Sequence, residues 1–434
     1  MARLQDRLAL ATWAASKFGA SGIGELGRSL REQREDWATD SHTGFFRVLE
    51  GLDGLQLGSD QLATYDDRIQ SYVAQLNVSR VTPIRLKYFQ YLGALFNEIF
   101  LERYFADRAG LVVELNDVVD THNGSIAGSD EMWPAFAEHD LRKVAFWMAT
   151  GSGKTLIMHM NLWQFLHHCP PEARPRNILL ITPNYGLSLQ HLREFEASGI
   201  DARWFGDPDA MTLFGQLPVT VIEITKLVEK KRGGGLTVAV EAFGENNLLL
   251  VDEAHRGASG DRWRELRKRL GGHGFTFEYS ATFGQIVNGA PPVQRGSLLE
   301  EYGKSILCDY SYSHFYADGY GKDYRVLNVR AASDEFDDTV VLANALGFVE
   351  QRLAFGQERA RLHAYNIELP LWVFVGHTVS GTTKDDKATL SDVQRLILFF
   401  DRFLSDRAGS LEAIRDILEG RSGLLDADGL DIFT

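Results

Sequence analysis

One short run of residues constrains the fold of this chain more than any other feature. Met148-Ala-Thr-Gly-Ser-Gly-Lys-Thr155 lies between an apolar run at residues 144–148 and a stretch of helical periodicity at 156–165. Glycines in such a loop let successive backbone N–H groups point at phosphate oxygens, and the helix that follows adds the positive end of its dipole. We therefore expect a strand, a phosphate-binding loop and a helix in this order.

The same loop carries the side chains that a nucleoside triphosphate requires. Lys154 is placed to reach the β- and γ-phosphates, and the hydroxyl of Thr155 can hold Mg²⁺. The strict motif begins with glycine, whereas this run begins with Met148, so a glycine-rich turn between a strand and a helix is the alternative. The expected nucleotide-binding residues are Ala149, Thr150, Gly151, Ser152, Gly153, Lys154 and Thr155.

Length and composition exclude a disordered, collagenous or coiled-coil protein. A chain of 434 residues is longer than a single domain usually is, and 44% hydrophobic with 24% charged residues is the balance of a soluble globular protein. No apolar run approaches the roughly 18 residues of a membrane helix, so we expect no membrane partner and a cytoplasmic location. The net charge of −14 argues against general nucleic-acid binding, so any contact with DNA or RNA should be local.

The order of apolar and helical runs predicts the domain organisation. Strands are expected at residues 144–148, 178–182, 219–222, 248–251 and 275–279, separated by helices, which is the pattern of an α/β fold with a parallel sheet. A helix at 86–105 should present one apolar face to the core. We expect a helical domain at 1–80, an α/β lobe at 81–305, an aromatic-rich connector at 306–335, and a second α/β pattern at 336–434 that includes a strand at 371–375.

Two further polar motifs follow predicted strands. Asp252-Glu-Ala-His255 comes directly after residues 248–251, and carboxylates at the carboxyl end of a parallel strand lie where α/β sheets bind ligands. Asp252 would hold the Mg²⁺ shell, and Glu253 would orient or deprotonate the attacking water. Alone, this tetrad has a charged strand end and helix cap as its alternative. Ser280-Ala-Thr282 follows the next strand, where hydroxyls usually satisfy backbone groups.

In this order, the three motifs resemble those of superfamily 2 helicases and translocases. Together with Asp252-Glu-Ala-His-Arg256 and Asp318-Gly-Tyr-Gly-Lys-Asp323, the phosphate loop looks most like that of the ATPase-translocase (Res) subunit of type III restriction systems and its relatives in phage defence. The resemblance spans roughly residues 83–380. It implies a RecA-like parallel sheet of the P-loop NTPase class, an N-terminal helical domain, an incomplete second RecA-like lobe, ATP and Mg²⁺ as cofactors, and DNA as partner, with RNA not excluded.

The resemblance also implies roles for individual residues. Gln90 matches the glutamine that reads the adenine edge, although a polar residue on a helix is the alternative. Thr182, Pro183 and Asn184 match a segment that contacts the nucleic-acid backbone, and Thr225 and Lys226 match its companion; a turn after a strand is the alternative for the first. His255 joins Lys154, Asp252 and Glu253 as a catalytic residue, and Ser280 and Thr282 would couple the nucleotide site to the nucleic-acid site.

The sequence departs from this family after the first lobe. Members continue through a complete second lobe with an arginine-bearing motif, and restriction subunits add a nuclease, but neither is recognisable here. Because such an arginine can be worth about 10³ to 10⁵ in rate, we expect weak hydrolysis by this chain alone, with other subunits of a defence complex supplying the missing lobe, nuclease or methylation function. The leading hypothesis is an ATP-dependent DNA translocase or helicase in restriction or anti-phage defence. The alternative is a non-motor ATP-binding scaffold or sensor.

Overall fold

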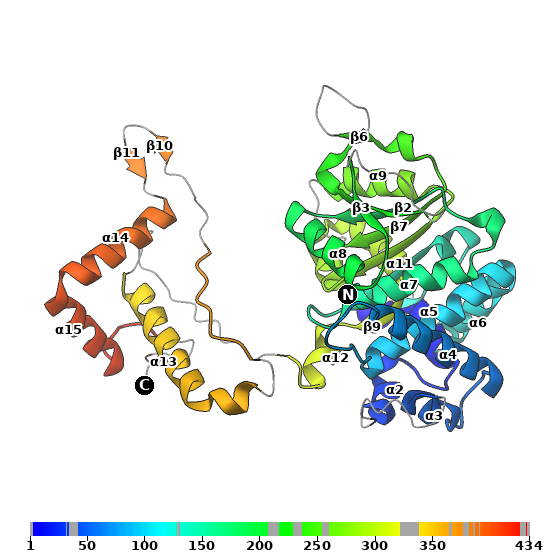
Figure 1. The fold of residues 1–434 in the computed structure, drawn as a ribbon, viewed down its shortest axis with the longest axis horizontal. Coiled ribbons are helices and arrows are strands. Elements are labelled where there is room, and N and C mark those ends of the chain that lie inside the picture. The colour runs from blue at the N-terminus through cyan, green and yellow to red at the C-terminus, as the bar shows by residue number, and fades with distance from the viewer. Residues whose placement is uncertain are drawn as a thin grey trace. The chain divides into compact units, whose positions relative to one another are not determined.

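The computed structural model divides the chain into two compact units, Met1–Lys322 and Asp323–Thr434 (Figure 1). Each unit is a separate body with its own core. The structure describes residues 3–31, 33, 42–126, 128, 131–206, 217–228, 237–253, 260–321, 338–363, 367–375, 382–384, 387–389, 391–425 and 431.

The first unit is built on a seven-stranded parallel sheet with the order β3-β4-β2-β7-β8-β1-β9. Its central strands are buried on both faces, and in β1, β2 and β7 this burial appears in the sequence as a continuous apolar run. All of the strands expected in this unit are confirmed, and so is the RecA-like α/β class. The strands are β1 (Lys143–Met148), β2 (Asn177–Thr182), β3 (Ala202–Trp204), β4 (Val219–Glu223), β7 (Asn247–Asp252), β8 (Phe275–Ser280) and β9 (Ile306–Tyr310).

Two strands of the sheet were not expected from the sequence. β3 has only three residues, all half-buried, and it pairs with β4 at one edge. β9 pairs with β1 at the other edge, inside the segment expected to be a connector. β3 is too short to give a clear apolar pattern, and the apolar run of β9 is interrupted by Asp309.

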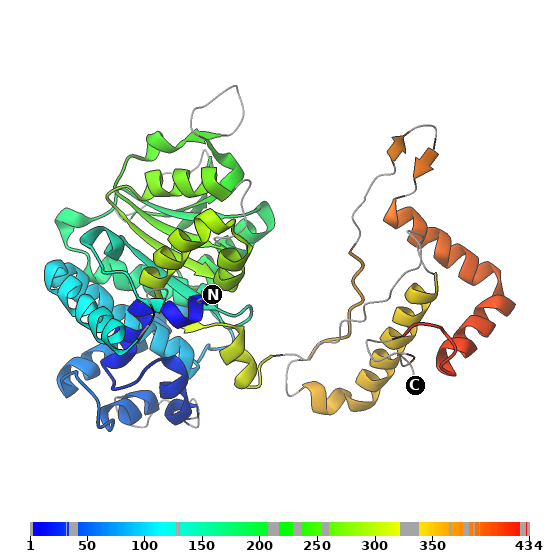
Figure 2. The same cartoon turned by 180° about the vertical axis from the view of Figure 1, so that it is seen from behind.

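Helices cover both faces of the sheet, and each face has its own apolar core. One core joins β-strand residues to α5 (Tyr88–Ala106), α7 (Lys154–His168) and the helices before them. The other joins the opposite face to α9 (Gly260–Gly271), α10 (Phe283–Gly289) and α11 (Pro292–Ser305), seen in yellow-green in Figure 2. The remaining helices of the unit are α1 (Ala9–Ser16), α2 (Ile23–Leu30), α3 (Gly44–Glu50), α4 (Ser59–Leu76), α6 (Arg108–Ser125), α8 (Tyr185–Ala197) and α12 (Tyr312–Ala317).

Helix α5 differs from its sequence-based expectation. We expected one apolar face, but every residue from Tyr88 to Leu101 is buried. α2, α4, α6 and α7 contact this helix, and so does β9. The helices before residue 80 therefore share one continuous core with the sheet, in which Trp13 packs edge-on against Phe100.

The second unit contains α13 (Asp338–His363), α14 (Asp392–Ser405) and α15 (Arg407–Leu418), with a small antiparallel pair of β10 (Thr382–Lys384) and β11 (Lys387–Thr389). The expected strand at 371–375 is wrong. These residues are not in a ladder with any described strand, and Leu371 and Val375 are 81% and 93% exposed. Without a neighbouring strand, an apolar run of this kind has no partner for its backbone groups. A second RecA-like lobe stays a prediction.

Membrane spans and cysteines can be described for the residues that the structure covers. No helix among them is long and apolar enough to cross a membrane. Cys169 and Cys308, which fit no zinc or disulfide spacing in the sequence, are both free and buried. Burial raises the pKa of Cys169 to about 11, so this thiol stays protonated at neutral pH.

Candidate functional site

The expected phosphate loop lies between the carboxyl end of β1 and the start of α7. The backbone N–H of Ala149 donates to the carbonyl of Tyr310 at 2.9 Å, which anchors the loop to the end of β9. Inside the loop, Ser152 donates to the carbonyl of Ala149 from both its backbone N–H and its hydroxyl. Gly151 and Gly153 have φ values of 85° and 90°, in the left-handed region that favours glycine. The two glycines thus permit the tight curl that the sequence predicted.

Gln90 on α5 lies against this loop, although 62 residues separate it from Ser152. Its Nε2 donates to the carbonyl of Ser152 at 2.8 Å, and its Oε1 accepts from the backbone N–H of Lys87 at 2.8 Å. A Cβ atom at Gly153 would approach Gln90 Nε2 to 2.3 Å. The amide therefore connects the start of α5 to the loop and leaves no room for a larger residue at 153.

A Gly153→Ala substitution tests this loop geometry. We expect the positive φ and the contact with Gln90 to cost about 1–3 kcal/mol, equivalent to about a 5- to 150-fold loss of affinity for a fluorescent ATP analogue. Gly289→Ala is the matched control, since a Cβ atom there meets nothing within 4 Å. Wild-type affinity and an unchanged unfolding midpoint in Gly153→Ala would contradict the conformation described here.

The two carboxylates of the acidic tetrad lie at the end of β7. Glu253 Oε1 is 3.9 Å from Lys154 Nζ, which also donates to the carbonyl of Met148 at 3.4 Å. Glu253 is the only described non-glycine residue with positive φ, at 51°, and its backbone N–H donates to the carbonyl of Tyr279. Such backbone conformations are uncommon and concentrate at functional sites. The structure thus brings together Lys154 and Glu253, which are about a hundred residues apart in sequence.

Asp252 is buried beside a histidine that the sequence did not single out. Its Oδ2 lies 2.8 Å from Nε2 of His191 on α8. A lone histidine on a helix carries no sequence signal for such a contact, because the contact depends on how α8 packs against β7. Nearby, His159 on α7 lies 2.9 Å from the hydroxyl of Ser198, and burial lowers its pKa well below the usual value. His159 therefore stays neutral and has a structural role.

The residues expected to contact nucleic acid lie at the ends of two neighbouring strands, β2 and β4. Asn184 is exposed and caps α8 by accepting from the N–H of Leu187. Thr225 is exposed and Lys226 half-buried, on a short 3-10 helix, Ile224–Lys226. In contrast, Thr182 is 1% exposed, and its hydroxyl bonds to that of Ser188.

The burial of Thr182 changes its expected role. A side chain with its hydroxyl held by Ser188 inside the protein supports the start of α8 and does not offer that hydroxyl to a ligand. Pro183, which follows it, is half-buried. Within this segment, the outward-facing side chain is that of Asn184.

The remaining expected residues follow β8. Ser280 is fully buried, and its hydroxyl accepts from the backbone N–H of Thr282 at 3.1 Å. The indole N–H of Trp147 on β1 donates to the carbonyl of Ala281, which attaches this segment to the strand that leads into the phosphate loop. His255 lies outside the described residues.

The arrangement fits a triphosphate with Mg²⁺. The loop offers backbone donors at the N-terminus of α7, where anions bind favourably. A Cβ atom at Gly153 would crowd the side chain of Gln90 against this loop. Lys154 adds a cation, and Thr155 and Asp252 carry oxygen atoms of the kind that Mg²⁺ prefers. The residue types and the left-handed conformations of Gly151 and Gly153 therefore both fit a bound triphosphate with Mg²⁺.

One other group of described residues has the spacing of a metal site. His42, Asp66 and Asp67 place ligand atoms within 4.8 Å of one another. Asp66, however, accepts hydrogen bonds from the backbone and hydroxyl of Thr43 and from the hydroxyl of Tyr91. These bonds account for Asp66 as a buried structural carboxylate.

Comparison with known proteins agrees with the geometry. The family model of the type III restriction enzyme, res subunit, matches residues 117–285. This segment contains the phosphate loop, both carboxylates and the Ser-Ala-Thr motif, while Gln90 precedes it. No curated protein matches the chain. The sequence resemblance is thereby confirmed over residues 117–285, which match the type III Res family, a helicase-like P-loop lobe of superfamily 2.

Proposed function

We propose that this chain is a nucleic-acid-dependent ATPase whose hydrolysis drives movement along DNA, in restriction or anti-phage defence. The family match supports a helicase-like, ATP-dependent motor. The observation that carries the proposal is the 3.9 Å approach of Lys154 Nζ to Glu253 Oε1. A cation that binds the terminal phosphate and a carboxylate that activates water are then within reach of one reacting group.

Each residue of the site has a distinct part in this proposal. The backbone donors of the loop and Lys154 bind the phosphates, and Glu253 accepts a proton from the attacking water. Thr155 and Asp252 would hold Mg²⁺, which when bound neutralises charge on the phosphate oxygens. The strained backbone at Glu253 supports this role, since it fixes the carboxylate at the end of β7.

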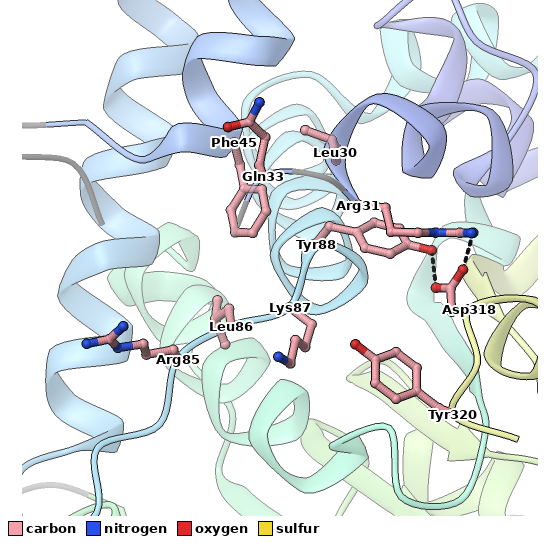
Figure 3. Close-up of a pocket in the computed structure, with 10 residues that line it drawn as sticks. All are labelled: Leu30, Arg31, Gln33, Phe45, Arg85, Leu86, Lys87, Tyr88, Asp318 and Tyr320. Carbon is pink, nitrogen blue, oxygen red and sulfur yellow. Dashed lines mark hydrogen bonds and ion pairs between the residues drawn. The ribbon is translucent and has the colours of Figure 1, made fainter. Parts of the chain in front are cut away.

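A cavity of about 370 Å³ beside the loop suits the nucleoside end of ATP (Figure 3). Lys87 in its wall is bonded to Gln90, which in turn bonds to the loop. Tyr320, also in the wall, connects the cavity to the loop by a second route, because its ring centroid is 5.4 Å from that of Phe315. The ring of Phe315 lies 4.0 Å from where a Cβ atom on Gly151 would be. We expect the base to lie in this cavity.

The N-terminal helices contribute to the same cavity. Leu30 on α2 and Phe45 on α3 form part of its wall, with Tyr88 and Arg31 beside them (Figure 3). Arg31 and the hydroxyl of Tyr88 both bond to the buried carboxylate of Asp318. In this proposal, the first helices of the chain help to form the nucleotide site.

A nucleic-acid path is proposed along the carboxyl ends of β2 and β4. These strands are neighbours, so Asn184 and the pair Thr225 and Lys226 lie at the same edge of the sheet. Amide, hydroxyl and ammonium groups hold a phosphate backbone without reading base sequence, which a motor moving along its track requires.

A Lys154→Ala variant tests the function directly. We expect wild-type ATP hydrolysis to rise with double-stranded DNA, single-stranded DNA or RNA, and the variant to lose about 10²- to 10³-fold in rate. Lys268→Ala, which removes an exposed lysine on α9, is the control and should keep wild-type activity. Steady-state hydrolysis measured with each nucleic acid identifies the track. Absence of both hydrolysis and nucleotide binding in the wild type would refute the proposal.

A non-motor nucleotide sensor is the second candidate. The observation that favours it is the absence of a parallel sheet from the described residues of the second unit, which leaves a single described nucleotide-binding lobe. Tight ATP binding that Lys154→Ala abolishes, with no hydrolysis on any nucleic acid, would select this function. Hydrolysis then requires another subunit, and the proposed partners are the other components of a defence complex.

A further inference from the structure

His191 has one polar contact among the described residues, and that contact is the carboxylate of Asp252. The distance from His191 Nε2 to Asp252 Oδ2 is 2.8 Å, and the two residues are 3% and 9% exposed. The other ring nitrogen, Nδ1, is buried without a hydrogen-bond partner in the described part of the chain. A histidine with this pattern satisfies Asp252 when its single proton is on Nε2.

Packing fixes the His191 ring in place. Phe195, one turn further along α8, is fully buried, and its ring centroid lies 6.3 Å from that of His191. His159 on α7 stacks on Phe195 as well, at 4.6 Å. The helix is held at its start by the hydrogen bond between Thr182 and Ser188. The donor on His191 therefore belongs to a buried ring, on a helix that is held at its start.

We propose that His191 is a positioning residue that orients Asp252 for Mg²⁺, an inference that rests on the proposed ATPase function. A hydrogen bond to Oδ2 fixes the plane of the carboxylate and leaves Oδ1 for the ion and its waters. Hydrogen-bond partners of ligating carboxylates typically contribute about 10- to 100-fold to metal affinity or activity. The bond also joins the nucleotide site to α8, the helix that Asn184 caps.

The test measures Mg²⁺-dependent nucleotide binding in the full chain. A fluorescent ATP analogue is titrated with Mg²⁺ for the wild type, His191→Leu, His191→Gln and His159→Leu, and binding without Mg²⁺ is measured in parallel. Leucine keeps an apolar contact with Phe195 but removes the donor, whereas the amide of glutamine can replace the Nε2 donor. His159→Leu is the matched control, because it changes the other histidine on Phe195 without touching Asp252.

We expect His191→Leu to need about 10- to 100-fold more Mg²⁺ for half-maximal binding, with its Mg²⁺-free affinity unchanged. His191→Gln should return most of the wild-type response, and His159→Leu should keep it. An unshifted Mg²⁺ requirement in His191→Leu, or an equal shift in His159→Leu, would overturn the inference alone. A wild-type chain that binds no nucleotide would overturn the proposed function, and this inference with it.

Discussion

A Glu253→Gln variant is expected to hydrolyse ATP about 10²- to 10⁴-fold more slowly than the wild type while binding it with similar affinity. Glutamine keeps the shape of the side chain but cannot accept a proton from the attacking water. Binding should persist because the loop donors and Lys154, which contact the phosphates in the proposed function, are untouched. Hydrolysis measured at saturating ATP and nucleic acid, together with the affinity for a fluorescent analogue, separates the two effects.

Glu223→Gln is the matched control for this experiment. Glu223 ends β4 in the same parallel sheet, so it is also a glutamate at the carboxyl end of a strand. In the sheet, β2 lies between β4 and β7, and Glu253 follows β7. Glu223→Gln should therefore leave the chemical step unchanged. Equal rates for Glu253→Gln and the wild type would remove Glu253 from the reaction, even if Lys154→Ala is inactive.

The second large effect is expected on the free energy of unfolding, from an ion cluster that joins β1 and β8 to α9. Glu278 on β8 is 1% exposed and lies 2.7 Å from Arg267 and 3.0 Å from Lys143. Burial alone would lower the pKa of Lys143, but Glu278 and Glu301 more than offset this and raise it above its usual value. Glu278→Gln leaves buried Arg267 without the carboxylate that it contacts and half-buried Lys143 with Glu301 alone, so we expect a loss of about 3–5 kcal/mol in the free energy of unfolding.

Urea denaturation of the full chain at neutral pH measures this loss. Replacing all four charged groups of the cluster, with Glu278→Leu, Glu301→Leu, Lys143→Met and Arg267→Met together, separates the loss of charge from the loss of packing. Buried ion clusters exchanged for apolar groups of similar volume are often neutral or stabilising, so this quadruple variant should recover most of the stability. A Glu278→Gln variant with the wild-type midpoint would show that the two cations reach other partners.

The central strands could be predicted from the sequence because burial on both faces leaves a clear pattern. β1, β2 and β7 are continuous apolar runs bounded by polar residues, β8 alternates aromatic with polar residues, and each formed where it was expected. The run at 371–375 has a similar pattern but is not in a ladder. An apolar run indicates that burial of these residues is favourable. It does not show that a neighbouring strand is present to form hydrogen bonds with it.

In the site too, residues in local motifs could be predicted and contacts between distant elements could not. Lys154, Asp252 and Glu253 were identified because each follows a predicted strand, and parallel strands present their carboxyl ends at one edge. Thr182 was expected to contact the nucleic-acid backbone but is buried, and its hydroxyl bonds to Ser188 on the following helix. His191 was not identified at all, since its contact with Asp252 joins two elements that are distant in sequence.

The sequence by itself determined the phosphate loop, the order of the central strands along the chain and the two carboxylates, because local periodicity and short motifs encode them. Only the tertiary structure decided the strand order in space, the burial of α5 on all sides, the contact of Gln90 with the loop and the hydrogen bond of His191 to Asp252. These features depend on distances between residues tens of positions apart, and such distances follow from how helices and strands pack and not from the pattern within any one of them.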